Sequence, residues 1–483
     1  MQFYLNKASP RQDYGAFNLI WNKQRKERPT MPKEELQLAD FVTGLKYEDI
    51  PPDSLAMVKK VLLTVSGTIV GGHHSEGMAE LAAFFGDMGG KPEATILIYN
   101  HKIPTQTAAL VNAAMARALD YCDSINPGPH FGAALISVGL ALTELKGSSG
   151  QDFLTAFAVG LETGSRFNLP EKAYGGADPT GLAGAFATTA MACRMLGLTR
   201  EQTLNALGIA LNNASGSFQS NIDGSLSVRL NQGMIAHDGI LAARLAQKGL
   251  TGPVNFLGGV YGYCNLQGRG MITPDYITDT IGKTWKLNNT VFKKYPSCFQ
   301  TASATEATLQ LMGETGLTAQ DVAAVELKIQ PFGYNLVGKC FNPGPTPKVD
   351  GQFSVAYCIA NALLRGESRL NCFEPNMVTA PEIAELTKKI TIISDAEIYR
   401  RGHSAIELKI MTTDGREMVK QLDEAPGTPH FPLTEADHLQ HLGDCLTFGG
   451  RPGVIANQAA LIETVNNFET KSDALDLLNL LNN

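Results

Sequence analysis

Four segments of the chain gather side chains that can transfer protons or hold a carboxylate, and the first runs from Leu119 to Gly132. Asp120, Ser124 and His130 stand there in a turn rich in Pro and Gly, between two apolar helical patterns. A carboxylate, a hydroxyl and an imidazole in one turn can bind a polar substrate and act as general acid or base. The alternative is that these side chains cap the two helices and satisfy the loop.

The second segment places two lysines before a proline turn and a cysteine after it, in the order Lys293, Lys294, Cys298. In a partly apolar cleft, Lys293 can lose its proton near neutral pH and act as a base. Cys298 opens the next helical pattern close to these lysines, so we expect its thiolate form to be favoured. The alternative is an exposed lysine pair followed by a buried, inert cysteine.

The third and fourth segments contribute an arginine and a tyrosine. Arg229 precedes a helical pattern that opens at Gly233, where a guanidinium can hold a carboxylate through two hydrogen bonds. Residues 350–357 form a polar entry into an apolar helix, with Tyr357 one turn inside it. A surface arginine on a loop and a tyrosine in the core are the alternatives for these two segments.

Sequence motifs for metals and nucleotides are absent. The eight cysteines form no CxxC pair, and the His and Cys residues lack the spacing of zinc ligands. The sequence also contains no phosphate-binding glycine loop, no HExxH and no GxSxG. We therefore expect neither a metal nor a cofactor.

Two kinds of periodicity divide the chain. In residues 34–287 the apolar residues mostly recur at helical spacing. Residues 288–428 contain stretches in which apolar and polar residues alternate with a period of two, as in strands, together with a hairpin signal. Residues 429–483 return to helical spacing and are expected to complete the first domain. The sequence therefore predicts a mainly α protein, with a large all-helical domain and a smaller α+β lid domain.

Composition narrows the classes of protein. The chain has 483 residues, 44% of them hydrophobic and 18% charged, which excludes a disordered chain or a coiled coil. A net charge of −7 makes nucleic acid an unsuitable partner, and we find no apolar run of the ~18–20 residues that a membrane span needs. Residues 1–33 are interpreted as a solvated basic arm, with a transit peptide as the alternative. Unpaired cysteines and the absence of a secretory signal indicate a reducing, cytoplasmic location.

The order and spacing of the four segments resemble the MmgE/PrpD family over about residues 35–480. This resemblance implies a large helical domain, a smaller α+β lid and a homodimer. It also implies cofactor-free chemistry on small di- or tricarboxylates in the cleft between the domains. On this basis the catalytic residues are expected to be Asp120, His130, Lys293 and Cys298, and the substrate-binding residues Ser124, Asp178, Arg229, Lys294 and Tyr357.

Two positions depart from the family pattern. Asp178 stands where decarboxylases of the family have a His before Pro, and Val228 stands where relatives commonly have Lys, with Arg229 beside it. Because two proton-handling side chains are changed, the preferred hypothesis is an isomerase, an epimerase of a dicarboxylate such as iminodisuccinate. A pair chosen from Lys293, Cys298 and His130 would then act on opposite faces of one carbon.

Two other hypotheses stay open at this stage. A lyase, acting as a dehydratase or decarboxylase, would use the same site with an acid that protonates the leaving group or the new carbanion. A dimeric protein that binds carboxylates without catalysis is a more remote alternative.

Overall fold

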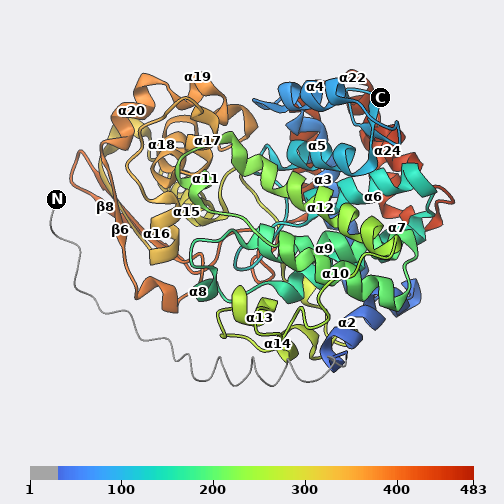
Figure 1. The fold of residues 1–483 in the computed structure, drawn as a ribbon. Coiled ribbons are helices and arrows are strands. Elements are labelled where there is room, and N and C mark those ends of the chain that lie inside the picture. The colour runs from blue at the N-terminus through green and yellow to red at the C-terminus, as the bar shows by residue number, and fades with distance from the viewer. Residues whose placement is uncertain (1–30, 483) are drawn as a thin grey trace, which may run out of the picture.

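The computed structural model describes residues 31–482, which form two lobes side by side (Figure 1). Residues 1–30 of the predicted basic arm lie outside the described residues. The first lobe is built from helices, the second from helices and one larger sheet, so the predicted fold class, mainly α with a smaller α+β unit, agrees with the structure.

The first lobe contains α2 (Lys33–Gly44), α3 (Pro52–Gly72), α4 (Met78–Met88), α5 (Thr105–Arg117), α6 (Gly132–Lys146), α7 (Gly150–Phe167), α8 (Glu171–Tyr174), α9 (Pro179–Leu196), α10 (Arg200–Asn213), α11 (Gln219–Ile222), α12 (Leu230–Gln247), α13 (Tyr263–Leu266) and α14 (Pro274–Thr278). Short strands β1 (Ala94–Ile96) and β2 (His101–Ile103) pair with each other, as do β3 (Ser124–Ile125) and β4 (Thr290–Val291).

Small residues let the central helices of this lobe approach closely. Gly239 on α12 lies so near α9 that an added Cβ would stand 2.3 Å from the hydroxyl of Thr188. Gly184 on α9 is similarly close to the side chain of Ile235. Gly and Ala recur along residues 233–247 of α12, and helices approach this closely only where side chains are small.

The second lobe contains α15 (Phe299–Thr315), α16 (Pro331–Val337), α17 (Pro347–Gln352), α18 (Val355–Arg365), α19 (Pro375–Val378) and α20 (Pro381–Thr387), with strands β5 (Val322–Ile329), β6 (Ile390–Ser394), β7 (Ile406–Thr412) and β8 (Glu417–Leu422). The four strands form one sheet in the order β6-β5-β7-β8. Strands β5 and β6 are parallel, and the other neighbours are antiparallel.

One face of this sheet is buried under α15 and α18. Leu327 on β5 pairs with Leu408 on β7, and both enter a core with Ile359 of α18 and Leu311 of α15. The burial of β5 and β7 alternates along each strand, as period-two sequences require when one face meets solvent.

The C-terminal helices return to the first lobe (Figure 1). These are α21 (Glu435–Gly449), α22 (Pro452–Ala456), α23 (Gln458–Asn466) and α24 (Leu475–Asn482). Helix α21 packs along α3, and Leu442, Leu461 and Leu477 belong to the large core of the first lobe.

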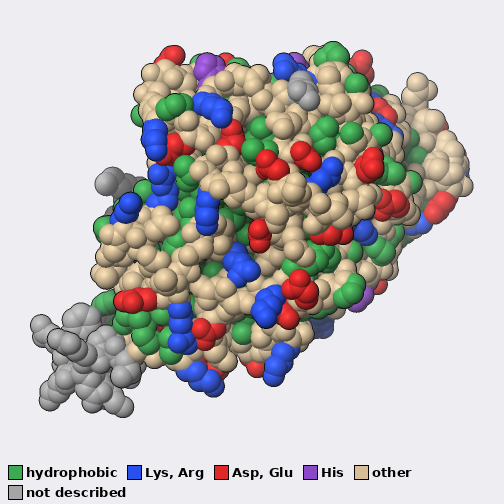
Figure 2. Space-filling view, turned by 90° about the vertical axis from the view of Figure 1, so that its right-hand side faces the viewer, with side chains coloured by type: hydrophobic (Ala, Val, Ile, Leu, Met, Phe, Trp, Pro, Cys, Tyr) green, Lys and Arg blue, Asp and Glu red, His purple; other side chains and the backbone are tan. Residues whose placement is uncertain are grey.

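Helix α3 is long and apolar enough to cross a membrane by length and composition, which the search for apolar runs in the sequence had missed. Most of it is buried inside the protein, as in the core helix of a soluble protein, so its apolarity is weak evidence for a membrane span. On the face in Figure 2, Lys and Arg side chains alternate with Asp and Glu rather than forming one large patch of a single sign.

Candidate active site

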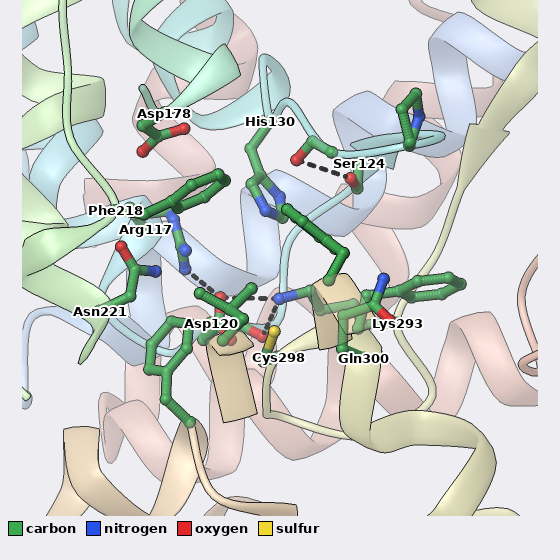
Figure 3. A pocket seen from close by; sticks show the side chains of 16 residues that line it. Arg117, Asp120, Ser124, His130, Asp178, Phe218, Asn221, Lys293, Cys298 and Gln300 are labelled. Atoms are coloured by element: carbon green, nitrogen blue, oxygen red, sulfur yellow. Dashed lines mark hydrogen bonds and ion pairs between the residues drawn. The ribbon is translucent and has the colours of Figure 1, made fainter. Parts of the chain in front are cut away.

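A pocket lies between the two lobes and gathers six of the nine site residues proposed from the sequence (Figure 3). Its empty space, opening included, measures about 480 Å³. Its lining consists of Arg117, Asp120, Ser124, Pro127, Gly128, His130, Asp178, Phe218 and Asn221 from the first lobe, and Lys293, Cys298, Phe299, Gln300, Phe332, Leu336 and Phe353 from the chain after β4.

Backbone pairing brings the first two motifs together across about 170 residues of chain. Strands β3 and β4 are antiparallel, with Ser124 opposite Val291. The hydroxyl of Tyr121 also donates to the carbonyl oxygen of Lys294 at 3.1 Å. The turn that carries His130 is therefore fixed to the segment that carries Lys293.

Asp120 is the charged centre of the pocket. Its Oδ1 accepts a hydrogen bond from Lys293 Nζ at 2.7 Å and another from the guanidinium of Arg117. The carboxylate and the ammonium are both only 2% exposed. Burial would raise the pKa of Asp120, but the positive charges of Arg117 and Lys293 hold it below its ordinary value, so Asp120 is ionised at neutral pH.

Lys293 keeps one donor for a substrate. Its ammonium also donates to the carbonyl oxygen of Asp120 at 3.0 Å. An ammonium has three N–H groups, and the third has no acceptor among residues 31–482. In this arrangement Lys293 is a hydrogen-bond donor paired with Asp120, and its role as a base stays a prediction.

His130 presents an unprotonated ring nitrogen to the pocket. Its Nδ1 lies 2.6 Å from the carbonyl oxygen of Asp123, so Nδ1 carries the proton and donates it, which leaves Nε2 as an acceptor. Nε2 has no hydrogen-bond partner among the described residues, and the ring is turned into the pocket (Figure 3). Burial, together with the charges of Arg117 and Lys293, lowers the pKa of His130 well below its ordinary value. The imidazole is therefore neutral at neutral pH.

Cys298 reverses one expectation from the sequence. It precedes α15, as predicted, but burial raises the pKa of its thiol to about 11, and the charge of Asp120 adds to this effect more than Lys293 opposes it. The predicted thiolate is therefore wrong. At neutral pH Cys298 is a protonated thiol that can serve as an acid.

Ser124 and Asp178 line the pocket but are engaged by their own loops. The hydroxyl of Ser124 donates to the carbonyl oxygen of Pro129 at 3.2 Å. Asp178 caps α9, where its Oδ1 accepts from the backbone N–H of Thr180 at 2.8 Å and its Oδ2 accepts from Asn231 at 2.7 Å. Burial raises the pKa of Asp178 above its ordinary value.

Three predicted binding residues do not line this pocket. Arg229 is buried with its guanidinium on the carbonyl oxygen of Glu76. Lys294 turns to the other side of its segment, where its ammonium is 2.8 Å from Glu306. Tyr357 is buried in the lid and donates to the carbonyl oxygen of Cys372. Each of these residues belongs to a motif that was expected at the site, but its side chain makes its contacts outside the pocket.

The structure adds residues that the sequence analysis missed. Arg117 ends the Ala-rich helix α5 three residues before Asp120, a spacing that could have indicated an ion pair. Gln352 links the fourth motif to the site. Its side-chain amide donates to the carbonyl oxygen of Leu119 at 2.8 Å, and its backbone carbonyl oxygen accepts from the backbone N–H of Cys298. That motif therefore supports the pocket through Gln352 rather than through Tyr357.

Gln300 connects the pocket to a contact between the lobes. Its amide lies 2.7 Å from Nε2 of His403, and Nδ1 of the same ring lies 2.7 Å from Glu171 of the first lobe. Nothing in the local sequence marks this set, because its members come from three distant segments.

The chain is similar to one protein family and to several proteins of known name. The chain matches the profile described as MmgE/PrpD N-terminal domain over residues 36–271 and the MmgE/PrpD C-terminal domain over residues 295–452. The cis-aconitate decarboxylase-like protein oryM of Aspergillus oryzae is 26% identical, with 92% of this chain and 96% of the relative aligned. The cis-aconitate decarboxylase of Aspergillus terreus is 25% identical, covering 81% and 85%. The 2-methylcitrate dehydratase of Cupriavidus necator is 26% identical over about half of each chain, 50% and 51%.

Proposed function

We propose that this chain, which belongs to the MmgE/PrpD family, is a lyase that acts on a carboxylic acid by proton transfer between its own side chains and the substrate. The observation that carries the proposal is the state of the pocket. One neutral imidazole faces the cavity together with the protonated thiol of Cys298 and with Lys293, which is ion-paired with Asp120. An unprotonated base beside acids is the set that elimination from a carbon next to a carboxylate requires.

Removal of water would proceed as follows. Nε2 of His130 takes the proton from the carbon next to the carboxylate, and the developing enolate is stabilised by the free N–H of Lys293 and by Arg117. The C–O bond to the neighbouring hydroxyl then breaks, its electron pair leaves with oxygen, and Cys298 supplies the proton that completes water. A double bond remains, and the imidazolium returns its proton through solvent to the thiolate.

Removal of CO₂ is the second candidate, and the coverage of the relatives favours it. The two Aspergillus relatives above, named as a decarboxylase and a decarboxylase-like protein, align with more than four fifths of this chain, whereas the relative named as a dehydratase aligns with about half. In that reaction the bond to a carboxylate breaks, CO₂ leaves, and the electron pair stays on carbon. Cys298 then protonates that carbon and is reprotonated by water.

The isomerase preferred from the sequence receives less support. The relatives above are named as lyases, and Lys293 is held by Asp120 rather than free to accept a proton. Lys293 is hydrogen-bonded to Asp120, and the charge of Asp120 also raises the pKa of Cys298. A two-base pair formed by these residues is therefore a poor fit to opposite faces of a carbon.

The test is proton NMR in D₂O with 2-methylcitrate, citrate, cis-aconitate, alkyl-substituted homologues and iminodisuccinate, with released CO₂ measured in parallel. New vinylic protons without CO₂ indicate a dehydratase, and CO₂ release indicates a decarboxylase. His130→Gln should remove dehydration, whereas His101→Gln, a change at an exposed position outside the pocket, should not. Exchange at carbon with inversion as the only change, or no reaction with any acid, would refute the lyase.

A further inference from the structure

The lining of the pocket combines charged and apolar side chains. Arg117, Asp120 and Lys293 are joined to one another by hydrogen bonds to the carboxylate of Asp120. The apolar part of the lining consists of Phe218, Phe299, Phe332, Leu336 and Phe353, with Pro127. A site for a small, fully charged acid needs cations around each carboxylate. The balance of cations and apolar side chains in the lining therefore indicates which kind of acid fits.

The cationic side chains of the lining have little positive charge left for a substrate. Arg117 and Lys293 are the cationic side chains of the described lining, and both are bonded to the carboxylate of Asp120. Asp178 brings a second carboxylate to the same lining. Two cations and two carboxylates therefore face the cavity, while His130 is neutral. Each additional substrate carboxylate placed here would lose water without gaining a cationic partner, which weakens binding.

Neighbouring cations do not relieve this deficit. Arg229 is directed at Glu76, and Lys294 forms an ion pair with Glu306 on the far side of its segment. Lys348, another buried cation of the lid, is 2.8 Å from Glu374. Lys294 and Lys348 are paired with carboxylates outside the pocket. Arg229 donates to the backbone carbonyl oxygen of Glu76, its guanidinium is 4.0 Å from the Glu76 carboxylate, and it does not line the pocket.

The apolar side chains of the lining come from both lobes. The ring of Phe218, from the first lobe, meets the ring of Phe332, from α16 of the second, edge to face at 5.9 Å. Tyr174 lies behind them, with its ring centroid 6.4 Å from each. Both phenylalanines are only half-buried, and Leu336 follows one turn after Phe332. This surface offers dispersion and desolvation to a hydrocarbon group and no donor to a carboxylate.

We propose that the substrate of this pocket presents a carboxylate to Arg117 and Lys293 and carries an alkyl substituent against Phe218, Phe332 and Leu336, in place of a third carboxylate. The pocket would thus select an alkyl-substituted acid over a small tricarboxylate. This inference rests on the proposed function for the location of the site, but it concerns binding, which can be measured without turnover.

The experiment is calorimetric titration of the full chain with four acids: succinate, butylsuccinate, hexylsuccinate and propane-1,2,3-tricarboxylate. Each methylene buried against an apolar wall raises affinity about threefold to fourfold. We therefore expect hexylsuccinate to bind at least tenfold more tightly than succinate, with butylsuccinate between them. The tricarboxylate should bind no more tightly than succinate.

Variants assign the effect to the wall. Phe218→Ala and Phe332→Ala should each shrink the advantage of hexylsuccinate over succinate to within about threefold, with little effect on succinate itself. Phe218→Arg, which places a cation among the apolar side chains, should raise the affinity for the tricarboxylate and lower the affinity for hexylsuccinate. Phe84→Ala removes a 59% exposed phenylalanine of α4 outside the pocket and is the matched control.

The other outcomes of the titrations would overturn either the binding proposal or the proposed lyase. Tightest binding of the tricarboxylate, no dependence on chain length, or the same loss in Phe84→Ala overturns the proposal. Failure of every acid to bind overturns it as well, because Arg117 and Lys293 would then hold no carboxylate. A clear preference for hexylsuccinate without turnover of any acid would instead refute the lyase and leave the binding inference standing.

Discussion

Asp120→Asn removes the one negative charge that Arg117 and Lys293 share while changing little else. Asp120 has a φ of +50°, a left-handed conformation that Asn adopts as readily as Asp, so the backbone is not strained by the change. The amide also keeps nearly the same volume. Any effect therefore reports the charge.

The expected size follows from burial. Asp120 is 2% exposed and bonds two cations, and breaking a buried ion pair by removing one partner lowers the free energy of unfolding by about 3–5 kcal/mol. Lys293 keeps its bond to the carbonyl oxygen of residue 120, so we expect about 3 kcal/mol. Loss of the preorganised ammonium should lower kcat by about 10²–10³-fold.

The pH profile gives a sharper signature. Burial lowers the pKa of His130 first, Arg117 and Lys293 lower it further, and Asp120 opposes them by raising it. Without the charge of Asp120, the pKa of His130 falls again. The base is active when unprotonated, so the acid limb of the pH dependence of kcat/KM should move to lower pH.

Stability of the native protein depends on pH through the same carboxylate. The folded pKa of Asp120 is below its ordinary value, so its contribution is complete above about pH 4 and is lost as pH falls through the folded pKa. Asp40→Asn is the control, since Asp40 is 56% exposed in an ion pair with Arg200, worth about 0–1 kcal/mol. Unchanged kcat with an acid limb that stays in place would refute the reasoning.

Three other predictions use different parts of the molecule. Iodoacetamide at pH 8 should label the exposed Cys340 far faster than Cys298, whose thiolate fraction is about 0.1%; similar rates by peptide mass spectrometry would contradict the buried thiol. Arg229→Met should lower the thermal midpoint but leave KM within about twofold, since Arg229 bonds Glu76 outside the pocket; a large rise in KM would return Arg229 to the site. Glu171→Gln should reduce kcat/KM by about tenfold through His403 and Gln300, and an unchanged value would show that this contact does not position Gln300.

Local rules in the sequence were enough for much of the fold. Helical spacing predicted helices within residues 34–287, where α9 and α10 lie, and α10 starts with a capping box between Thr199 and Gln202. Alternating residues predicted strands within residues 288–428, where β5 and β7 pair at the centre of the sheet with one register shift after Val322. These elements succeed because the patterns that define them lie within a few residues.

The site was predictable only where the chemistry lies in one motif. Asp120, His130 and Lys293 were found because their residue types are unusual in otherwise apolar surroundings. The direction of Arg229 was not predictable, because it depends on Glu76, which lies more than 150 residues away. The thiol state of Cys298 depends on burial by the lid, and a sequence reports the helix that follows Cys298 but not the depth at which it starts.

The pairing of Asp120 with two cations explains how a base and anion-binding groups can coexist in one small pocket. Arg117 and Lys293 would repel each other if they were buried alone, and Asp120 allows both to be held there. Their positive charges in turn help to keep His130 unprotonated, so in the proposed reaction the groups that would hold a carboxylate also preserve the base beside them. Because Asp120 neutralises part of that charge, the proposed site would accept few carboxylates, and the phenylalanines of the lining would contact the rest of the substrate.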